Sequence, residues 1–307
     1  MAVVSDKLHP KARVLVAQFA RAPALADMTP VEARGAPTPL AAGPEAVASV
    51  TARAIPGPGA PLGIRVYRPV NASRAALVYF HGGGWVIGNL DGADETCRML
   101  ANRGRVVVIS IAYRLAPETK FPGAVDDAYA AVRWSAEHAS ELGIEASRLA
   151  VGGSSAGGNL AAVAALVARE RGGPKIVFQL LSVPVTELRS TARSMEEFAE
   201  GYGLSRADME WFGSHYVRNE ADRDDPHASV LRADLHGMPP AFVVTAECDP
   251  LRDDGEAYAK RLSDVGIASR VKRYPGMFHG FMGFPRALPE AAEAFDDAGA
   301  ALRGALG

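Results

Sequence analysis

A serine between two glycines is the feature of this sequence best suited to chemistry. Gly153, Ser155 and Gly157 follow a run of strand-forming residues, and an alanine-rich helical pattern begins directly after them. So tight a turn between a strand and a helix strains its serine and exposes it, an arrangement called a nucleophile elbow. Side chains at the two glycine positions would collide with the neighbouring strand or helix. The pattern predicts that Ser155 is a nucleophile, although such a pentad also arises by chance in loops.

A serine hydroxyl is a poor nucleophile at neutral pH, so it needs a base, and the base needs an orienting acid. Of the seven histidines only His279 lies beyond the last predicted strand, where the base of a serine–acid–histidine order belongs. The acid should follow the strand predicted at 240–247. Asp249 is best placed, because Pro250 fixes a turn just past that strand. Other carboxylates qualify by position, and for the last two a helix N-terminus is a sufficient explanation: Glu247, Asp253 and Asp254.

Attack on a carbonyl creates an oxyanion, which needs preorganised N–H donors. The backbone N–H of Ala156, directly after the serine, is one candidate donor. Gly83 and Gly84, in a His-Gly-Gly-Gly-Trp sequence after the third predicted strand, offer others because glycine lets the backbone approach a substrate closely. The alternatives are a phosphate-binding loop or a flexible turn. Nucleotide binding is not favoured, because neither of the usual glycine-rich nucleotide motifs is present.

Apolar segments and helical patterns alternate along most of the chain. The segments at 75–80 and 106–112 are too continuously apolar for a half-exposed sheet and indicate buried parallel strands. Further strands are predicted at 47–55, 62–69, 148–153, 175–182, 240–247 and 269–274. Helices are predicted at 8–21, from Pro30 onward, and at 124–141, 157–171, 252–265 and 289–303. This alternation predicts an α/β fold with a mostly parallel, eight-stranded sheet covered by helices on both faces.

Two parts of the chain fall outside this alternation. Residues 185–236 hold no convincing strand but include a helix start at Ser205, with Asp208 three residues on. Together with the N-terminal helices, this segment is expected to cover the strand ends as a lid. The predicted organisation is an N-terminal cap at 1–45, a cap insertion at 185–236, and core parts at 46–184 and 237–307.

The composition is that of an ordinary globular protein, with 307 residues, 48% of them hydrophobic and 22% charged. A formal charge of −2 gives no electrostatic reason to expect nucleic acid or an anionic membrane as a partner. Cys97 and Cys248 are far apart and lack metal-type spacing, so reduced thiols are expected. No apolar run approaches the roughly 20 residues that span a bilayer. The N-terminal segment favours an amphipathic helix over a signal peptide, so a cytoplasmic location is expected.

Taken together, the motifs resemble those of the hormone-sensitive-lipase-like α/β-hydrolases, the bacterial family IV carboxylesterases. They occur in the family's order and cover residues 75–285. The matching segments are 81–85, 113–118, 121–122 with 126–127, 153–159, 249–253 and 279–281. The resemblance implies an α/β-hydrolase fold with a helical cap. It also implies a triad of Ser155, Asp249 and His279, and an oxyanion hole formed by the N–H groups of Gly83, Gly84 and Ala156.

The same resemblance implies that the helix after Ser205 supplies residues of an acyl pocket. The candidates for substrate binding are Met209, Trp211 and Phe212, together with Trp85 of the glycine loop. Two positions depart from the family. Ser154 stands where aspartate or threonine is frequent, and Val230 stands where proline is frequent. The first departure is not expected to impair the triad but bears on a supporting hydrogen bond or on substrate preference. The second bears on the path by which the lid returns to the core.

The predicted function is that of a serine carboxylesterase acting on short-to-medium acyl esters through an acyl-enzyme. Hydrolysis of an amide, a formamide or a lactone by the same triad is an alternative, because specificity lies in the pocket. A non-catalytic small-ligand receptor of the same fold is another, although the presence of His279 argues for turnover. The triad and oxyanion hole need no metal or cofactor. A small ester is the expected partner, and the resemblance leaves a homodimer open.

Overall fold

The computed structural model describes residues 7–35 and 44–307, so parts of the predicted N-terminal cap, 1–6 and 36–43, lie outside the described residues. One eight-stranded sheet runs through the molecule in the order β1-β2-β4-β3-β5-β6-β7-β8. Its strands are β1 (Ser49–Ile55), β2 (Leu62–Arg68), β3 (Ala76–Phe80), β4 (Val107–Ala112), β5 (Leu149–Ser154), β6 (Ile176–Ser182), β7 (Ala241–Cys248) and β8 (Ser269–Phe278). β2 pairs antiparallel with β1 and with β4, and the other neighbours pair in parallel. The predicted mostly parallel sheet is therefore confirmed.

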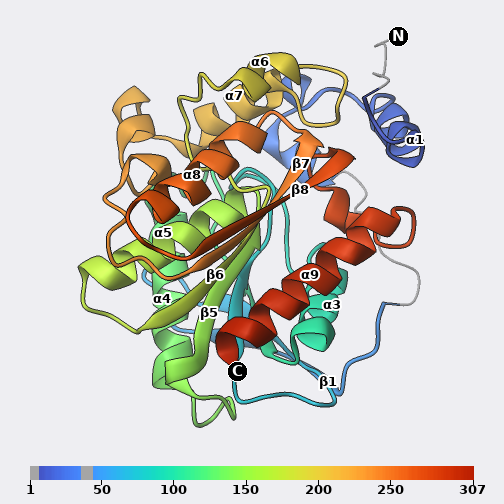
Figure 1. The fold of residues 1–307 in the computed structure, drawn as a ribbon. Helices are drawn as coiled ribbons and strands as arrows, with labels where there is room; N and C mark the ends of the chain where they lie inside the picture. Colours follow the sequence, from blue (N-terminus) through green and yellow to red (C-terminus); the bar gives the residue numbers. More distant parts are fainter. Residues whose placement is uncertain (1–6, 36–43) are drawn as a thin grey trace.

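Helices cover both faces of this sheet (Figure 1). The α-helices are α1 (Pro10–Phe19), α2 (Pro30–Gly35), α3 (Asp94–Gly104), α4 (Gly123–Glu137), α5 (Ala156–Glu170), α6 (Arg193–Glu197), α7 (Arg206–Tyr216), α8 (Arg252–Asp264) and α9 (Pro289–Leu306). α4, α5 and α8 lie on one face, and α3 and α9 lie on the other (Figure 1). Within the described ranges, no helix is long and apolar enough to cross a lipid bilayer.

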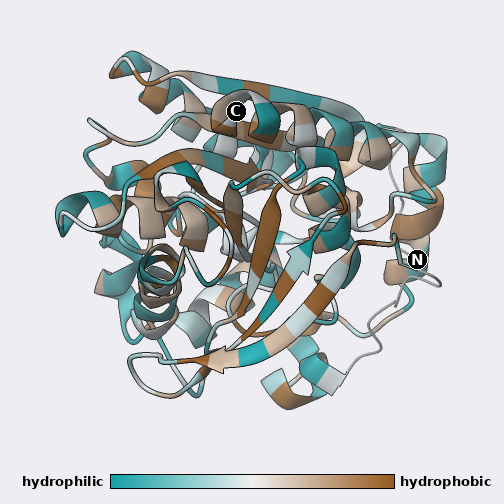
Figure 2. Ribbon diagram, turned by 90° about the horizontal axis from the view of Figure 1, so that it is seen from below, coloured by the Kyte–Doolittle hydropathy of each residue, from teal (hydrophilic) through white to brown (hydrophobic). Residues whose placement is uncertain are grey.

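The strands bury side chains on both faces, as continuous apolar runs require. Along β3, Ala76, Val78 and Phe80 join the core beneath α4 and α5, whereas Leu77 and Tyr79 join the core beneath α3 and α9. Figure 2 shows the hydrophobic residues concentrated in the central strands and the hydrophilic ones on the outer helices. The sheet is thus buried between two apolar layers, and its strand ends are held at fixed positions.

The sequence analysis did not predict α3, which packs against α9. Its buried positions include Cys97, Leu100 and Gly104, spaced as one helical face. These side chains are mostly small, and charged residues separate them, so the apolar periodicity is weak in the sequence. A side chain at Gly299 of α9 would lie 2.3 Å from the Cβ of Arg103, which shows how closely the two helices approach. Cys97 and Cys248 are both buried and free, which confirms the expected thiols.

The segment 185–236 carries α6 and α7 and no strand, and all of it is described. The helix start predicted at Ser205 is confirmed, because Ser205 and Asp208 form a reciprocal capping box at the N-terminus of α7. Figure 1 shows α6 and α7 at the end of the sheet where β7 and β8 terminate. The segment therefore covers the strand ends that carry the candidate site.

The N-terminal helices are fastened to the same end of the molecule. The N–H of His9 donates to the carbonyl of Gly276, and the indole of Trp211 donates to the carbonyl of Met28. The Arg34 guanidinium donates to the carbonyl of Val86 and pairs with Glu118. These bonds tie residues 7–35 to α7, to the glycine loop and to the segment after β4.

An ion pair braces the segment that follows β4. The Arg114 guanidinium makes charge-assisted bonds of 2.7–3.0 Å to the carboxylate of Asp127 on α4, which also accepts the backbone N–H of Arg114. Asp127 is fully buried, whereas Arg114 is partly exposed. Loss of the carboxylate would leave the guanidinium and this N–H without their partner.

Replacement of Asp127 by alanine should therefore destabilise the protein by about 3 kcal/mol. Urea unfolding followed by circular dichroism measures this difference. Asp126→Ala is the matched control, because this carboxylate also lies near Arg114 but is only partly buried and accepts no side-chain hydrogen bond within the described residues. An equal loss of unfolding free energy in the two variants would show that the buried Arg114–Asp127 pair does not stabilise this region.

Candidate active site

Ser155 lies in the turn between β5 and α5 and adopts φ 57° and ψ −119°. Such a conformation is strained for a residue with a side chain and persists only when the surroundings impose it. The N–H of Ser155 donates to the carbonyl of Ser182 on β6 at 2.9 Å, and its carbonyl accepts the N–H of Asn159 at 3.0 Å. The strand-to-helix turn expected from the sequence is confirmed.

The two flanking glycines are required by close backbone approach. A Cβ at Gly153 would lie 2.2 Å from the carbonyl oxygen of Gly157, and a Cβ at Gly157 would lie 2.0 Å from that of Phe80. Real side chains do not tolerate such distances, and these obstacles are backbone atoms that cannot rotate away. The start of α5 therefore lies directly against the end of β3, and Ser155, between the two glycines, is largely buried at 9% exposure.

His279 and Asp249 form the second part of the site. The Nδ1 of His279 lies 2.9 Å from an Asp249 carboxylate oxygen, and the other oxygen accepts the N–H of Leu251 at 2.8 Å. Asp249 is fully buried. A carboxylate held in this way fixes the imidazole with its proton on Nδ1, so that Nε2 is free to accept a proton.

The loops that carry these residues follow adjacent strands. Asp249 comes directly after β7, and His279 comes directly after β8. The Glu247 carboxylate accepts the N–H of Gly276 at 2.7 Å, which joins the ends of the two strands. Parallel strands end at the same edge of the sheet, so residues 30 positions apart are brought within hydrogen-bond distance.

Ser155 and His279 line one cavity of about 320 Å³. Apolar side chains from the N-terminal helices and from the segment 185–236 close it over the strand ends. These are Phe19, Leu25, Leu204, Met209 and Phe212. An apolar cavity with a few convergent polar groups is the usual form of a small-molecule site.

The glycine loop after β3 lies beside Ser155. Gly83 and Gly84 have φ of 117° and 56°, which glycine adopts readily. Their N–H groups donate to no backbone carbonyl of the described residues. Ala156 is the first residue of α5, where helix N–H groups have no partner within the helix. A Cβ at Gly84 would meet the ring of Phe212 at 2.1 Å, so this loop also supports α7.

His81 lies at the base of the glycine loop and is buried. Its ring stacks on Tyr113 with centroids 4.3 Å apart, and its Nδ1 lies 2.8 Å from the carbonyl oxygen of Gly82. Burial lowers the pKa of His81 to about 4, so the ring is neutral at pH 7. The Tyr113 hydroxyl donates to the carbonyl of His81 at 2.9 Å. These contacts hold the loop in position.

The four candidates for substrate contact separate into two groups. Met209 and Phe212 line the cavity with Ser155. Trp85 and Trp211 lie outside its wall: Trp85 is fully buried against Tyr216, with ring centroids 4.1 Å apart, and Trp211 bonds to the N-terminal segment. Phe19 and Leu25 also line the cavity but were not predicted as substrate contacts. No local sequence pattern shows which face of an N-terminal helix meets the strand ends.

Within residues 7–35 and 44–307, no group of three or more potential ligands among histidine, cysteine, aspartate and glutamate is arranged to hold a metal ion.

The position of Asp254 at a helix N-terminus, which the sequence suggested as its sufficient explanation, does not account for its burial. The residue is buried, and its Oδ2 accepts no hydrogen bond from any group in the described part of the chain. Burial raises the pKa of Asp254 from 3.8 to about 6, with nearby Glu187 acting in the same direction. Asp253, its neighbour, instead accepts the N–H of Ser194.

Known proteins resemble this chain in sequence and in fold. A family model described as the α/β hydrolase fold matches residues 77–283. The chain is 44% identical to the carboxylic ester hydrolase LipN of Mycobacterium tuberculosis, a match covering 78% of this chain and 66% of that protein. It is 44% identical to the carboxylesterase NlhH of the same species, a match covering 79% of this chain and 78% of the relative. A crystal structure of an α/β hydrolase enzyme from the metagenome of Lake Arreo superposes with a TM-score of 0.93 at 42% identity, covering 98% and 99% of the two chains.

The first prediction for this site concerns Gly157, two residues after Ser155. Gly157→Ala forces a Cβ into the carbonyl of Phe80, so the variant should lose several kcal/mol of stability and its Ser155 geometry. Gly304→Ala is the control, because nothing lies within 4 Å of a Cβ there and the change lies in α9. The control should be neutral or more stable by up to about 1 kcal/mol. Thermal unfolding of both variants measures these changes in stability. A Gly157→Ala protein as stable as the wild type would contradict the close approach of α5 to the carbonyl of Phe80.

The second prediction concerns pH. At high pH the native state must hold the Asp254 charge in a buried site, so its contribution to stability falls as pH rises from about 4 to about 6. Asp254→Asn removes this titration. The variant should therefore gain about 3 kcal/mol relative to the wild type between pH 4 and pH 7. Urea unfolding of both proteins at each pH measures the difference in the free energy of unfolding. If this free energy changed equally with pH in the two proteins, a raised pKa of Asp254 would be ruled out.

Proposed function

The chain belongs to the α/β-hydrolase family and is a carboxylic ester hydrolase, and from this premise we propose that Ser155, His279 and Asp249 are its catalytic triad. The observation that carries the proposal is the 2.9 Å contact between His279 and the buried Asp249, beside a cavity that contains both Ser155 and His279. A nucleophile, a base and an orienting carboxylate are the three groups that acyl transfer requires.

In the proposed mechanism, His279 Nε2 takes the proton of Ser155 Oγ as that oxygen attacks the ester carbonyl. The tetrahedral intermediate collapses, the carbon–oxygen bond to the alcohol breaks, and His279 gives its proton to the departing oxygen. A water molecule then attacks the acyl-enzyme, with His279 again taking and returning the proton. Asp249 holds the tautomer and stabilises the imidazolium in both steps.

The oxyanion of each tetrahedral intermediate is assigned to the N–H groups of Gly83, Gly84 and Ala156. Their lack of backbone partners supports this role, because donors already fixed and free need no rearrangement during the reaction. Gly83 and Gly84 both have a positive φ, a backbone conformation that residues with a side chain adopt only with strain.

We propose Met209 and Phe212 as acyl-pocket residues. The cavity of about 320 Å³ with apolar walls supports short-to-medium acyl chains as substrates. Trp85 and Trp211 are assigned a supporting role, because Trp85, at the end of the glycine loop, stacks on Tyr216, and Trp211 anchors the N-terminal segment. Amides, formamides and lactones remain the alternative substrates for the same triad. A role as a non-catalytic receptor is disfavoured, because His279 is present, contacts Asp249 and lines the same cavity as Ser155.

We further propose that the described N-terminal helices and the segment 185–236 act as a cap over this cavity, since both contribute to its wall. A homodimer and a cytoplasmic location stay predictions from the sequence. A small ester is the partner on which the site acts.

Ser155→Ala should abolish hydrolysis of p-nitrophenyl butyrate apart from a small residual rate over water. Asp249→Asn should keep the fold but lower kcat on the order of 10⁴-fold, because His279 then loses its fixed tautomer. Initial rates at pH 7 measure both effects. Ser263→Ala and Asp264→Asn, both on α8, are the controls and should keep wild-type kcat. Wild-type rates in Ser155→Ala would end the proposal.

A further inference from the structure

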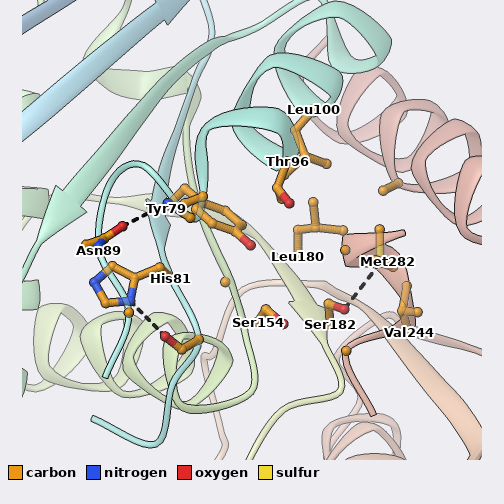
Figure 3. A pocket seen from close by; sticks show the side chains of 18 residues that line it. Tyr79, His81, Asn89, Thr96, Leu100, Ser154, Leu180, Ser182, Val244 and Met282 are labelled. Atoms are coloured by element: carbon orange, nitrogen blue, oxygen red, sulfur yellow. Dashed lines mark hydrogen bonds between the residues drawn. The ribbon is translucent and has the colours of Figure 1, made fainter. Parts of the chain in front are cut away.

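A second cavity, of about 250 Å³, lies next to the first on the α3 and α9 side of the sheet (Figure 3). We call it the lower cavity. Its wall includes Tyr79 of β3, Thr96 and Leu100 of α3, and Leu180 of β6, with Met282 and Ala298 closing the far side. The wall is mostly apolar, and no step of the proposed mechanism uses it.

The lower cavity adjoins the reacting serine. Gly82, Ser154 and Gly280 line both cavities. A Cβ at Gly82 would lie 3.6 Å from the Cβ of Ser155, so this shared wall touches the nucleophile. A Cβ at Gly280, directly after His279, would meet nothing within 4 Å, so open space lies beside the base as well. A group bound in the lower cavity is therefore within reach of a carbonyl attached to Ser155.

Two hydroxyl groups in the lower cavity lack partners. Tyr79 is only 5% exposed, and its hydroxyl forms no hydrogen bond with any group in the described part of the chain. The same holds for the hydroxyl of Thr96, and Figure 3 shows both hydroxyls turned toward the same space. By contrast, Ser182 in the same wall donates to the sulfur of Met282 at 3.2 Å. Tyr79 is buried and Thr96 is partly buried, and both line the lower cavity, so a ligand oxygen there can form the hydrogen bonds that no side chain of the described residues supplies.

Ser154 determines how much room is left beside the nucleophile. It precedes Ser155 directly and contributes only a hydroxymethyl group to the wall that the two cavities share. Any larger side chain at this position would occupy the junction between them. The small residue keeps the path from the reacting carbon to the lower cavity open.

We propose that the lower cavity is a second substrate subsite, and the inference rests on the proposed ester hydrolysis. An ester carbonyl has two substituents, and one cavity cannot hold both when they extend in different directions. The first cavity, which Ser155 and His279 line, takes one of these substituents under the proposed cap. The lower cavity takes the other, a compact, largely apolar group that carries an ether, keto or hydroxyl oxygen, which accepts a hydrogen bond from Tyr79.

The test uses two pairs of esters of matched size. Butyl acetate and 2-methoxyethyl acetate differ only in the alcohol part, by one ether oxygen in place of a methylene. Methyl pentanoate and methyl 3-methoxypropanoate differ in the same way in the acyl part. Proton release at constant pH gives kcat/KM for each ester and for methyl acetate, the reference. Comparing each variant with the wild type cancels the intrinsic reactivity of each ester.

Tyr79→Phe removes a single oxygen, and we expect it to lower kcat/KM of the ether ester about tenfold relative to its hydrocarbon partner, in one pair only. Thr96→Leu fills the cavity and should lower kcat/KM of both members of that same pair at least tenfold relative to methyl acetate. Tyr129→Phe on α4 and Thr51→Leu on the exposed edge strand β1 are the matched controls and should change neither ratio. The pair that responds shows whether the acyl or the alcohol part enters the cavity.

Equal effects of Tyr79→Phe on both members of each pair, or unchanged ratios in Thr96→Leu, would overturn the inference. Either result is distinct from failure of the proposed function. If the chain were no esterase, the wild type would not hydrolyse methyl acetate and Ser155→Ala would make no difference.

Discussion

The close approach of α5 to the end of β3 is the constraint on which the site depends. With carbonyl oxygens only 2.0–2.2 Å from the positions of absent Cβ atoms, the turn has room for backbone alone at Gly153 and Gly157. Ser155, between them, must then take a left-handed conformation that packing of the sheet imposes. Because the same contact places the start of α5 against the carbonyl of His81 at the base of the glycine loop, one feature of the backbone positions both the proposed nucleophile and the proposed oxyanion donors.

The electrostatic part of the site depends on the order of the strands. β7 and β8 are parallel neighbours, so the loops after them carry Asp249 and His279 to the same place. Burial would raise the energy of the Asp249 carboxylate, but the imidazole and the N–H of Leu251 occupy its two oxygens. The bond between Glu247 and Gly276 fixes the spacing of the two loops. A charge stabilised in this way keeps the base oriented without a metal or a mobile partner.

Those parts of the protein that follow local rules could be predicted from the sequence. The central strands, such as 75–80 and 106–112, were evident because they are continuous apolar runs, and Ser155, Asp249 and His279 stood out because each follows a predicted strand. α3 escaped because its buried face consists mostly of small residues between charges, so that only its packing against α9 reveals it. The lining of the cavity escaped for a similar reason. Whether Trp211 or Phe212 faces the serine depends on how α7 rests on Gly84 and Met28, which are distant in the sequence.

Chemistry and specificity therefore depend on different kinds of contact in this fold. The groups proposed as the triad and as the oxyanion donors are positioned by strand ends, by the start of α5 and by glycines that leave little room for a side chain. The walls of the two cavities come from side chains of the cap segments above and of α3, α9 and β3 below. These side chains can be exchanged while the backbone of the elbow stays as it is. Ser154 is the exception, because it adjoins the nucleophile and also lines both cavities. In the proposed site a larger residue at this position is expected to take space from one of the two cavities, and so to change which substrates fit beside Ser155.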